Sequence, residues 1–194
     1  MKINNLSVGQ RPIGRKAFRF SLPILCMFIA AFSFACQKLE IRQEYQSPNR
    51  DFIVSFPGKP NETTHTSQLS NGDVKYPKVV WTGKGVTLDI SYSEIPDLRP
   101  LNSDEAKEYY EFLRTHTIKM NNSQLMESNE VTVNGKIVQD FTEVRLGGKV
   151  TRYRLFLLGT KLLSLRAEQD VNVRPMAATT STVENFMTSV RFPD

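Results

Sequence analysis

The sequence predicts an α+β fold in which an antiparallel sheet is packed by helices on both faces, an α/β/α sandwich. Many short segments alternate apolar and polar residues and are separated by tight-turn dipeptides, which is typical of antiparallel strands. Two segments instead repeat apolar residues at helical spacing. The C-terminal strands carry apolar residues on both faces, and an antiparallel sheet of that kind needs cover on both sides.

The N-terminal strands follow from alternation and turn residues. Residues 51–56 place Phe52, Val54 and Phe56 on one face, and residues 86–93 show the clearest alternation in the chain. Between them, residues 70–73 (SNGD) predict a hairpin turn. These features indicate a run of antiparallel strands before residue 95.

Two helices interrupt and close the strand pattern. In residues 102–120, Asn102 is a capping residue and Glu105 stands at the third helical position, which predicts a capping box. Residues 179–190 form a clean apolar stripe at helical spacing: Val183, Phe186, Met187 and Val190. Three aromatic residues of the first helix are expected in the core rather than along a groove: Tyr109, Tyr110 and Phe112.

Residues 124–167 predict a tight meander of four strands. Its turns are Asn134-Gly135, Gly147-Gly148 and Gly159-Thr160. If the last two are two-residue turns, Glu143 lies opposite Arg152 and Phe141 lies opposite Arg154. On this register one face carries Ile137, Phe141, Val150, Phe156, Leu163 and Leu165. The other face carries Val138, Val144, Tyr153, Leu155, Leu157 and Leu162.

The N-terminus indicates export. A basic lead precedes an apolar run of 16 residues, 20–35, and no acidic residue occurs before Glu40. A spanning helix needs about 20 apolar residues, so the run fits a signal-peptide core better. We therefore expect a signal peptide at 1–35, a polar tether at 36–49 and a single globular domain at 50–194.

The end of the apolar run, Ser33-Phe34-Ala35-Cys36, resembles the lipobox of bacterial lipoproteins. In that family the cysteine is acylated and becomes the new N-terminus. The match departs at Ser33 and Phe34, where the family usually has Leu and a small residue. The resemblance implies a lipid-anchored protein on the periplasmic or extracellular side of a bacterial membrane. Export with the same cleavage but no lipid, and an uncleaved anchor helix, remain alternatives.

Charge and cysteine content argue against nucleic-acid binding and against a disulfide in the mature chain. The chain has 25 Lys and Arg residues against 20 Asp and Glu residues, and 5 of the basic residues precede Cys36. The remaining 20 basic and 20 acidic residues cancel, so the mature chain shows no basic excess for nucleic acid. The full sequence has two cysteines, Cys26 inside the predicted signal peptide and Cys36. Only Cys36 would remain after cleavage, which excludes an intrachain disulfide in the mature chain.

Two stretches carry a wider resemblance. Residues 52–60 (FIVSFPGKP) match an opening motif, F-x-V-x-FPGKP, of small exported bacterial proteins. Residues 154–159 and 183–192 match the ending of the same proteins. Over residues 50–192 the chain therefore resembles the PsbP-like superfamily. That resemblance implies an antiparallel sheet sandwiched by helices and a non-catalytic role, and it assigns no metal or docking residue.

No catalytic, cofactor or metal constellation stands out. His65 and His116 are the only two histidines, and a zinc site normally takes three or four ligands. The chain has no Gly-x-Ser-x-Gly nucleophile motif and no phosphate-binding glycine loop. We therefore expect no cofactor and no enzymatic activity.

A cluster of arginines is the one candidate surface site. On the derived register Arg145, Arg152 and Arg154 share a face, which Glu143 neutralises in part, and the cluster is a candidate anion or partner patch. Cross-strand ion pairing is the structural alternative.

The leading functional hypothesis is a lipid-anchored, non-catalytic module that binds an unidentified protein partner. Its first alternative is a carrier of a small apolar ligand between sheet and helix, suggested by the apolar residues on both faces. Its second is an unrecognised hydrolase, which would need a polar cleft containing His65 or His116.

Overall fold

The computed structural model describes residues 42–69, 72–83, 85–95, 99–170 and 177–193. All of them belong to the unit Glu40–Asp194, while the predicted signal peptide and Cys36 lie outside the described residues. The elements, in chain order, are β1 (Gln43–Gln46), β2 (Ile53–Phe56), β3 (Asn61–Leu69), β4 (Gly72–Gly83), β5 (Val86–Glu94), α2 (Ser103–Met120), β6 (Ser123–Val133), β7 (Lys136–Arg145), β8 (Lys149–Leu158), β9 (Lys161–Asp170) and α3 (Ala177–Met187). Among the described helices, none is both long and apolar enough to cross a bilayer.

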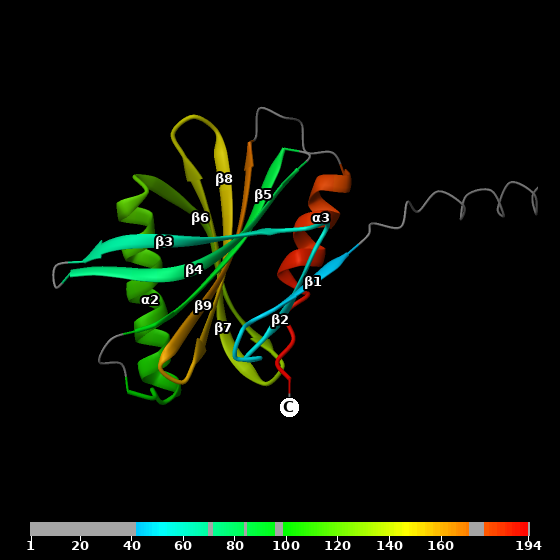
Figure 1. Cartoon of the computed structure of the whole chain (residues 1–194). Coiled ribbons are helices and arrows are strands. Elements are labelled where there is room, and N and C mark those ends of the chain that lie inside the picture. The colour runs from blue at the N-terminus through cyan, green and yellow to red at the C-terminus, as the bar shows by residue number, and fades with distance from the viewer. Residues whose placement is uncertain (1–41, 70–71, 84, 96–98, 171–176, 194) are drawn as a thin grey trace, which may run out of the picture. The chain divides into compact units, whose positions relative to one another are not determined.

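Seven strands form one antiparallel sheet in the order β3-β4-β5-β9-β8-β7-β6 (Figure 1). The strands β1 and β2 form a separate two-stranded ribbon. Ile53 of β2 exchanges two backbone hydrogen bonds with Arg191, of 2.8 and 2.9 Å, so the ribbon is joined to the C-terminal end of the chain. The meander predicted from residue 124 onward corresponds to β6 to β9.

Two of the three predicted turns of the meander are confirmed. Val133 pairs with Lys136 across Asn134 and Gly135, both of which have positive φ angles, 50° and 73°. Asn and Gly adopt such angles more easily than other residues, which explains their place in this turn. Leu158 pairs with Lys161, as a two-residue turn requires.

The predicted turn between β7 and β8 is wrong by one residue. Arg145 pairs with Lys149, so the loop has three residues, and Leu146 belongs to it with the two glycines. Phe141 therefore lies opposite Tyr153 instead of Arg154, and Glu143 lies opposite Thr151 instead of Arg152. A one-residue slip moves every side chain of a strand to the other face.

The corrected register redefines the two faces of the sheet. The face that we call the α3 face carries Val138, Val144, Val150, Phe156, Leu163 and Leu165. The opposite face, the α2 face, carries Ile137, Phe141, Tyr153, Leu155, Leu157 and Leu162. The residues of β8 and β9 were grouped correctly from the sequence, and those of β7 were exchanged between the faces.

The core on the α3 face is formed jointly by α3 and the β1–β2 ribbon. The predicted apolar stripe is confirmed, because Val183, Phe186, Met187 and Val190 are all buried. They pack in one cluster with Phe52, Val54 and Phe56 of the ribbon segment and with apolar residues of β4, β5, β7, β8 and β9. Burial of this apolar surface is the main stabilising contribution on this side.

The helix α2 packs on the other face through a smaller cluster. The capping box is confirmed: Asn102 Oδ1 accepts from the N–H groups of Asp104 and Glu105 at 3.0 Å, and the Glu105 carboxylate accepts from the Asn102 N–H at 3.0 Å. Tyr110 is buried against Phe141, Tyr153 and Leu155. The remainder of that face is only in part covered by the helix.

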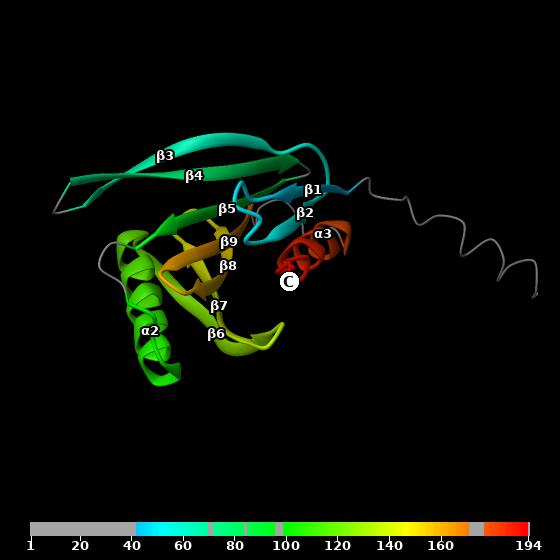
Figure 2. The ribbon, with the colours of Figure 1, turned by 60° about the horizontal axis from the view of Figure 1, so that its bottom comes forward.

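The uncovered part of the α2 face is charged. There Arg166 Nε donates to Asp89 at 2.8 Å, and Lys149 Nζ donates to Glu168 at 2.9 Å. The antiparallel sheet with two helices, and hence the α+β class, is confirmed. The prediction of a full sandwich with helices on both faces was overstated, because each helix covers only part of its side (Figure 2).

A strand, β1, lies inside the range predicted as a tether, residues 36–49. Within that range β1 pairs with β2, from Gln43 opposite Phe56 to Gln46 opposite Ile53. The Ser47 side chain is buried and accepts from the Phe52 N–H at 3.3 Å. Mostly polar residues hid this strand from pattern reading, because only Tyr45 of β1 packs against the core.

Candidate binding site

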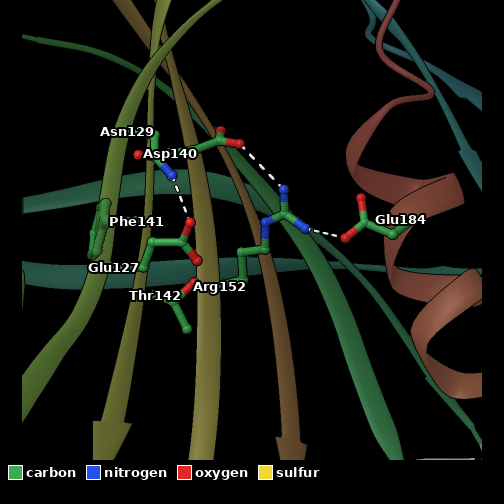
Figure 3. A pocket seen from close by; sticks show the side chains of 7 residues that line it. All are labelled: Glu127, Asn129, Asp140, Phe141, Thr142, Arg152 and Glu184. Atoms are coloured by element: carbon green, nitrogen blue, oxygen red, sulfur yellow. Dashed lines mark hydrogen bonds and ion pairs between the residues drawn. The ribbon is translucent and has the colours of Figure 1, made fainter.

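A hollow of about 300 Å³ opens on the α3 face, where β6, β7 and β8 run past the side of α3 (Figure 3). It is lined by Glu127, Asn129, Asp140, Phe141, Thr142, Arg152 and Glu184. Three lining residues are acidic and one is basic. The hollow is therefore a polar site with an excess of negative charge.

The hollow exists because two neighbouring strands change from apolar to polar on the same face. In β7, Val138 is followed at two-residue steps by Asp140 and Thr142. In β8, Phe156 is preceded in the same way by Arg154 and Arg152. The polar residues face each other across the ladder, with Asp140 opposite Arg154 and Thr142 opposite Arg152.

A buried ion pair adjoins the hollow through Asp140, one of its lining residues. Arg154 donates to both oxygens of Asp140, from Nε at 2.7 Å and from Nη2 at 2.6 Å, and both residues are 6% exposed. Its Nη1 donates to the Met187 carbonyl at the end of α3, at 2.7 Å. A cation at a helix C-terminus is favourable, so this pair also fixes α3 to the sheet.

Among the charged side chains at the walls of the hollow, not all form ion pairs. Arg152 lies between two carboxylates, forming an ion pair with Asp140 at 3.4 Å and another with Glu184. Asn129 Nδ2 donates to Glu127 at 2.7 Å, and Glu127 forms no ion pair with any described residue. Glu127 is also exposed, so its carboxylate is open to a ligand in the hollow.

A second polar cluster lies on the α2 face and is closed. The Glu143 side chain is fully buried and accepts from Asn121 at 2.8 Å, Ser123 at 2.7 Å, Arg145 at 3.1 Å and Tyr153 at 3.1 Å. Burial and the Glu143 charge raise the pKa of Tyr153 to about 12. Asn121 is the C-cap residue of α2, so this cluster fixes the helix end to the sheet.

The structure divides the predicted arginine patch between these two clusters. Arg152 and Arg154 share the α3 face at the hollow, while Arg145 lies on the α2 face beside Glu143. Each of the three forms an ion pair with a carboxylate. They do not make one patch, because the register that placed them together was shifted by one residue.

The two histidines lie away from the hollow. His65, on β3, is exposed, and the centroid of its ring lies 5.3 Å from that of Tyr76. His116, on α2, is exposed and stacks on Phe112 at 5.8 Å. In the part of the chain that the structure describes, no three His, Cys, Asp or Glu residues gather in an arrangement that would hold a metal ion.

Sequence reasoning found Arg152 and missed the acidic residues around it. A signal for them was present: Asp140 and Thr142 interrupt an otherwise apolar alternation, as do Arg152 and Arg154 in the next strand. Glu127 gave no signal, because a β-bulge between Leu125 and Glu127 shifts its register. Glu184 looks like an ordinary solvent-facing residue of α3 until the strands are placed beside it.

Comparison with known proteins supports the fold at low sequence identity. No family model matches the chain, and no curated protein matches its sequence. The solution structure of cyanobacterial PsbP (CyanoP) from Synechocystis sp. PCC 6803 is similar, with a TM-score of 0.56 and 14% identity over 82% of this chain and 98% of that one. At this identity the likeness concerns the fold, and the chain has a PsbP-like fold.

Two further structures are more distant. The Ran-binding protein Mog1p of Saccharomyces cerevisiae has a TM-score of 0.49 and 12% identity over 79% of this chain and 96% of that one. A protein of unknown function from Pseudomonas aeruginosa, described as a putative regulator, has a TM-score of 0.43 and 11% identity over 79% of this chain and 99% of that one. The fold assignment therefore relies on the cyanobacterial structure.

Proposed function

We propose that the chain is a non-catalytic, exported lipoprotein, held to a bacterial membrane through acylated Cys36, whose PsbP-like domain binds a partner that presents a cationic group. The observation that carries the proposal is the acidic hollow with Glu127 at its wall. Two of its three carboxylates, Asp140 and Glu184, are paired with Arg152 or Arg154, whereas Glu127 has only an amide partner among the described residues. A lysine, arginine or amine supplies the charge and donors that this site lacks.

The hollow argues against a carrier of apolar ligands. A site for such a ligand is a cavity of a few hundred Å³ with a mostly apolar lining. The two hollows described next to Phe56 and Phe186, and next to Phe52 and Ile90, have volumes of only about 10 Å³ each. Of these three hollows among the described residues, the one with room for a ligand is lined mostly by polar residues.

The hydrolase alternative also lacks support from the site. Its nucleophile and base would have to lie within hydrogen-bond reach of each other. Neither histidine lines the hollow, and Asp140 is fully engaged by two arginines. A binding role uses these groups as they stand.

The anchor is tested by replacing Cys36. We expect the wild-type chain to fractionate with membranes and to incorporate radiolabelled palmitate, and Cys36→Ser to incorporate none. The Cys26→Ser variant is the matched control and should behave as wild type. Equal labelling of the two variants would refute the lipid anchor at Cys36. Absence of label from the wild-type chain and from both variants would refute it as well.

The hollow is tested by photo-crosslinking in intact cells. A photoreactive amino acid at Thr142, inside the hollow, should give a discrete adduct, and the same group at Thr63, exposed on β3, should not. The adduct should weaken with Glu127→Gln and persist with Glu62→Gln, an exposed glutamate on β3. Adduct formation that is insensitive to Glu127→Gln would exclude the charge-based recognition proposed here.

A further inference from the structure

The outward side of α2 carries Phe112, whose ring adjoins those of Tyr109 and His116, so the expectation that Phe112 lies in the core was wrong. Phe112 is 59% exposed, and the centroid of its ring lies 6.1 Å from that of Tyr109 and 5.8 Å from that of His116. At 100° per residue Phe112 lies about 160° around the helix from the buried Tyr110, so it faces away from the sheet.

Exposed apolar side chains are concentrated around this helix. The large ones among the described residues are Phe112, Met120, Leu125, Met126 and Leu146. They belong to α2, to the start of β6 and to the β7–β8 turn. These segments adjoin, because Asn121 and Asn122 join α2 to β6 and Ser123 pairs with Arg145, the residue before Leu146. An exposed aromatic side chain on the outward side of a helix, such as Phe112, is suited to contact a partner surface.

Two charges flank the rings, and they are of opposite sign. Glu108 and Lys119 lie within about 40° of Phe112 on the helical wheel, one toward each end of α2. Both are exposed, and neither forms an ion pair with any described residue. They cannot pair with each other, because they are eleven positions apart along the helix, a rise of about 16 Å.

We infer that this face binds a second copy of the chain, with the two α2 helices antiparallel across a two-fold axis. An axis midway between Glu108 and Lys119 passes between Phe112 and Thr115. It brings Glu108 of one copy opposite Lys119 of the other, twice by symmetry, with the two Phe112 rings between these pairs. The surface is therefore complementary to itself in charge and in apolar character.

Crosslinking tests the geometry in membranes of cells that produce the full chain. Thr115 is exposed and lies beside the proposed axis, so Thr115→Cys should give a disulfide-linked dimer on mild oxidation. Thr63→Cys, exposed on β3, is the control, and the unsubstituted chain gives the background from Cys26 and Cys36. No Thr115→Cys dimer above the Thr63→Cys level would overturn the inference.

Charge exchange tests the occupant. In the Thr115→Cys background, Glu108→Lys or Lys119→Glu alone should lower the crosslinked fraction by about tenfold, because each makes two like-charge contacts. The double exchange should restore it. Both residues are exposed, so Glu108→Lys should retain the wild-type unfolding midpoint, whereas Lys119→Glu places a negative charge in the last turn of α2 and should lower the midpoint slightly. Equal loss in the double exchange would overturn the paired geometry.

A membrane surface is the competing occupant. If this face binds a membrane surface, the fluorescence emission of the Phe112→Trp variant should shift to the blue. The shift should appear when anionic phosphatidylglycerol vesicles are added to the detergent-purified chain. A shift that depends on vesicles and is insensitive to chain concentration would overturn the dimer. A shift that depends on chain concentration alone supports it.

Discussion

A single buried arginine connects three parts of the molecule. Arg154 comes from β8, its carboxylate partner Asp140 comes from β7, and the Met187 carbonyl ends α3. A buried charge is tolerated only when it is paired and its donors are used. Arg154 satisfies that requirement, and Arg152, one step nearer the solvent, shares the same carboxylate at 3.4 Å.

Removing this guanidinium should be costly. We expect Arg154→Met to lower the free energy of unfolding by about 3–5 kcal/mol, because Asp140 would stay buried with a weaker partner. Replacing both partners, as Arg154→Met with Asp140→Leu, should recover much of the loss. Urea unfolding followed by circular dichroism measures both. Lys107→Met, which breaks an exposed pair with Glu130, should cost less than about 1 kcal/mol.

Tyr153 makes the stability depend on alkaline pH. Its pKa is about 12 in the folded chain, where burial disfavours the phenolate, against 10.0 for the free side chain. Between these values the unfolded chain has released the proton and the folded chain still holds it, so stability falls as pH rises from 10 to 12. At about 1.4 kcal/mol per pH unit, the loss is on the order of 2–3 kcal/mol.

The variant Tyr153→Phe removes this titration. Its unfolding free energy should decline less steeply than wild type between pH 10 and 12, although it starts lower at pH 7 because Glu143 loses one donor. Urea unfolding at a series of pH values gives the two slopes. Parallel curves for wild type and variant would show that Tyr153 does not titrate in this range.

The hydroxyl of Tyr110 joins the middle of α2 to the backbone of the sheet. The ladder between β7 and β8 ends at the pair Val138 and Phe156. Beyond it, Tyr110 accepts from the Leu157 N–H at 2.8 Å and donates to the Ile137 carbonyl at 3.1 Å. The side chain thus takes the place of the next pair of the ladder, and the helix becomes part of the hydrogen bonding of the sheet.

The Tyr110→Phe substitution isolates that contribution. It keeps the ring packing but leaves the Leu157 N–H and the Ile137 carbonyl without their partner, which should cost about 1–3 kcal/mol. Hydrogen exchange should show faster exchange of the Leu157 amide than in wild type. The neighbouring Tyr109→Phe is the control, since no described hydrogen bond uses its hydroxyl. An unchanged Leu157 amide would contradict the bridging role.

The elements themselves were largely predictable, because alternation, capping and turn residues act locally. Asn102 with Glu105 identified the start of α2, and the stripe ending at Val190 identified α3. The β7–β8 register was not predictable, because Gly147 and Gly148 fit a two-residue turn as well as the observed three-residue loop. That one-residue difference decides which charges meet, and so it hid the hollow.

At the scale of the whole molecule, two cores share one sheet. The cluster around α3 and the cluster around α2 lie on opposite sides of the same strands, β7, β8 and β9. The ribbon β1–β2 adds to the first cluster through Tyr45, Phe52 and Val54. The sequence pattern assigned Tyr45 to a tether, because a single apolar residue among polar ones has no period to detect.

The boundary of the folded domain can be tested by truncation. A chain that begins at Glu40 keeps β1, whereas one that begins at Arg50 loses Tyr45, the Ser47 hydrogen bond to Phe52 and the pairing of β1 with β2. Full burial of one large side chain contributes about 1.5–3 kcal/mol. Tyr45 is only partly buried, so with the loss of the Ser47 hydrogen bond and the β1 pairing the shorter chain should unfold about 2 kcal/mol more easily. Urea unfolding of the two purified chains measures the difference. The substitution Tyr45→Ala in the longer chain should reproduce much of the loss, because it removes the packing and keeps the backbone pairing. Equal stability of the chains beginning at Glu40 and Arg50 would show that residues 43–46 do not contribute to the stability of the folded domain.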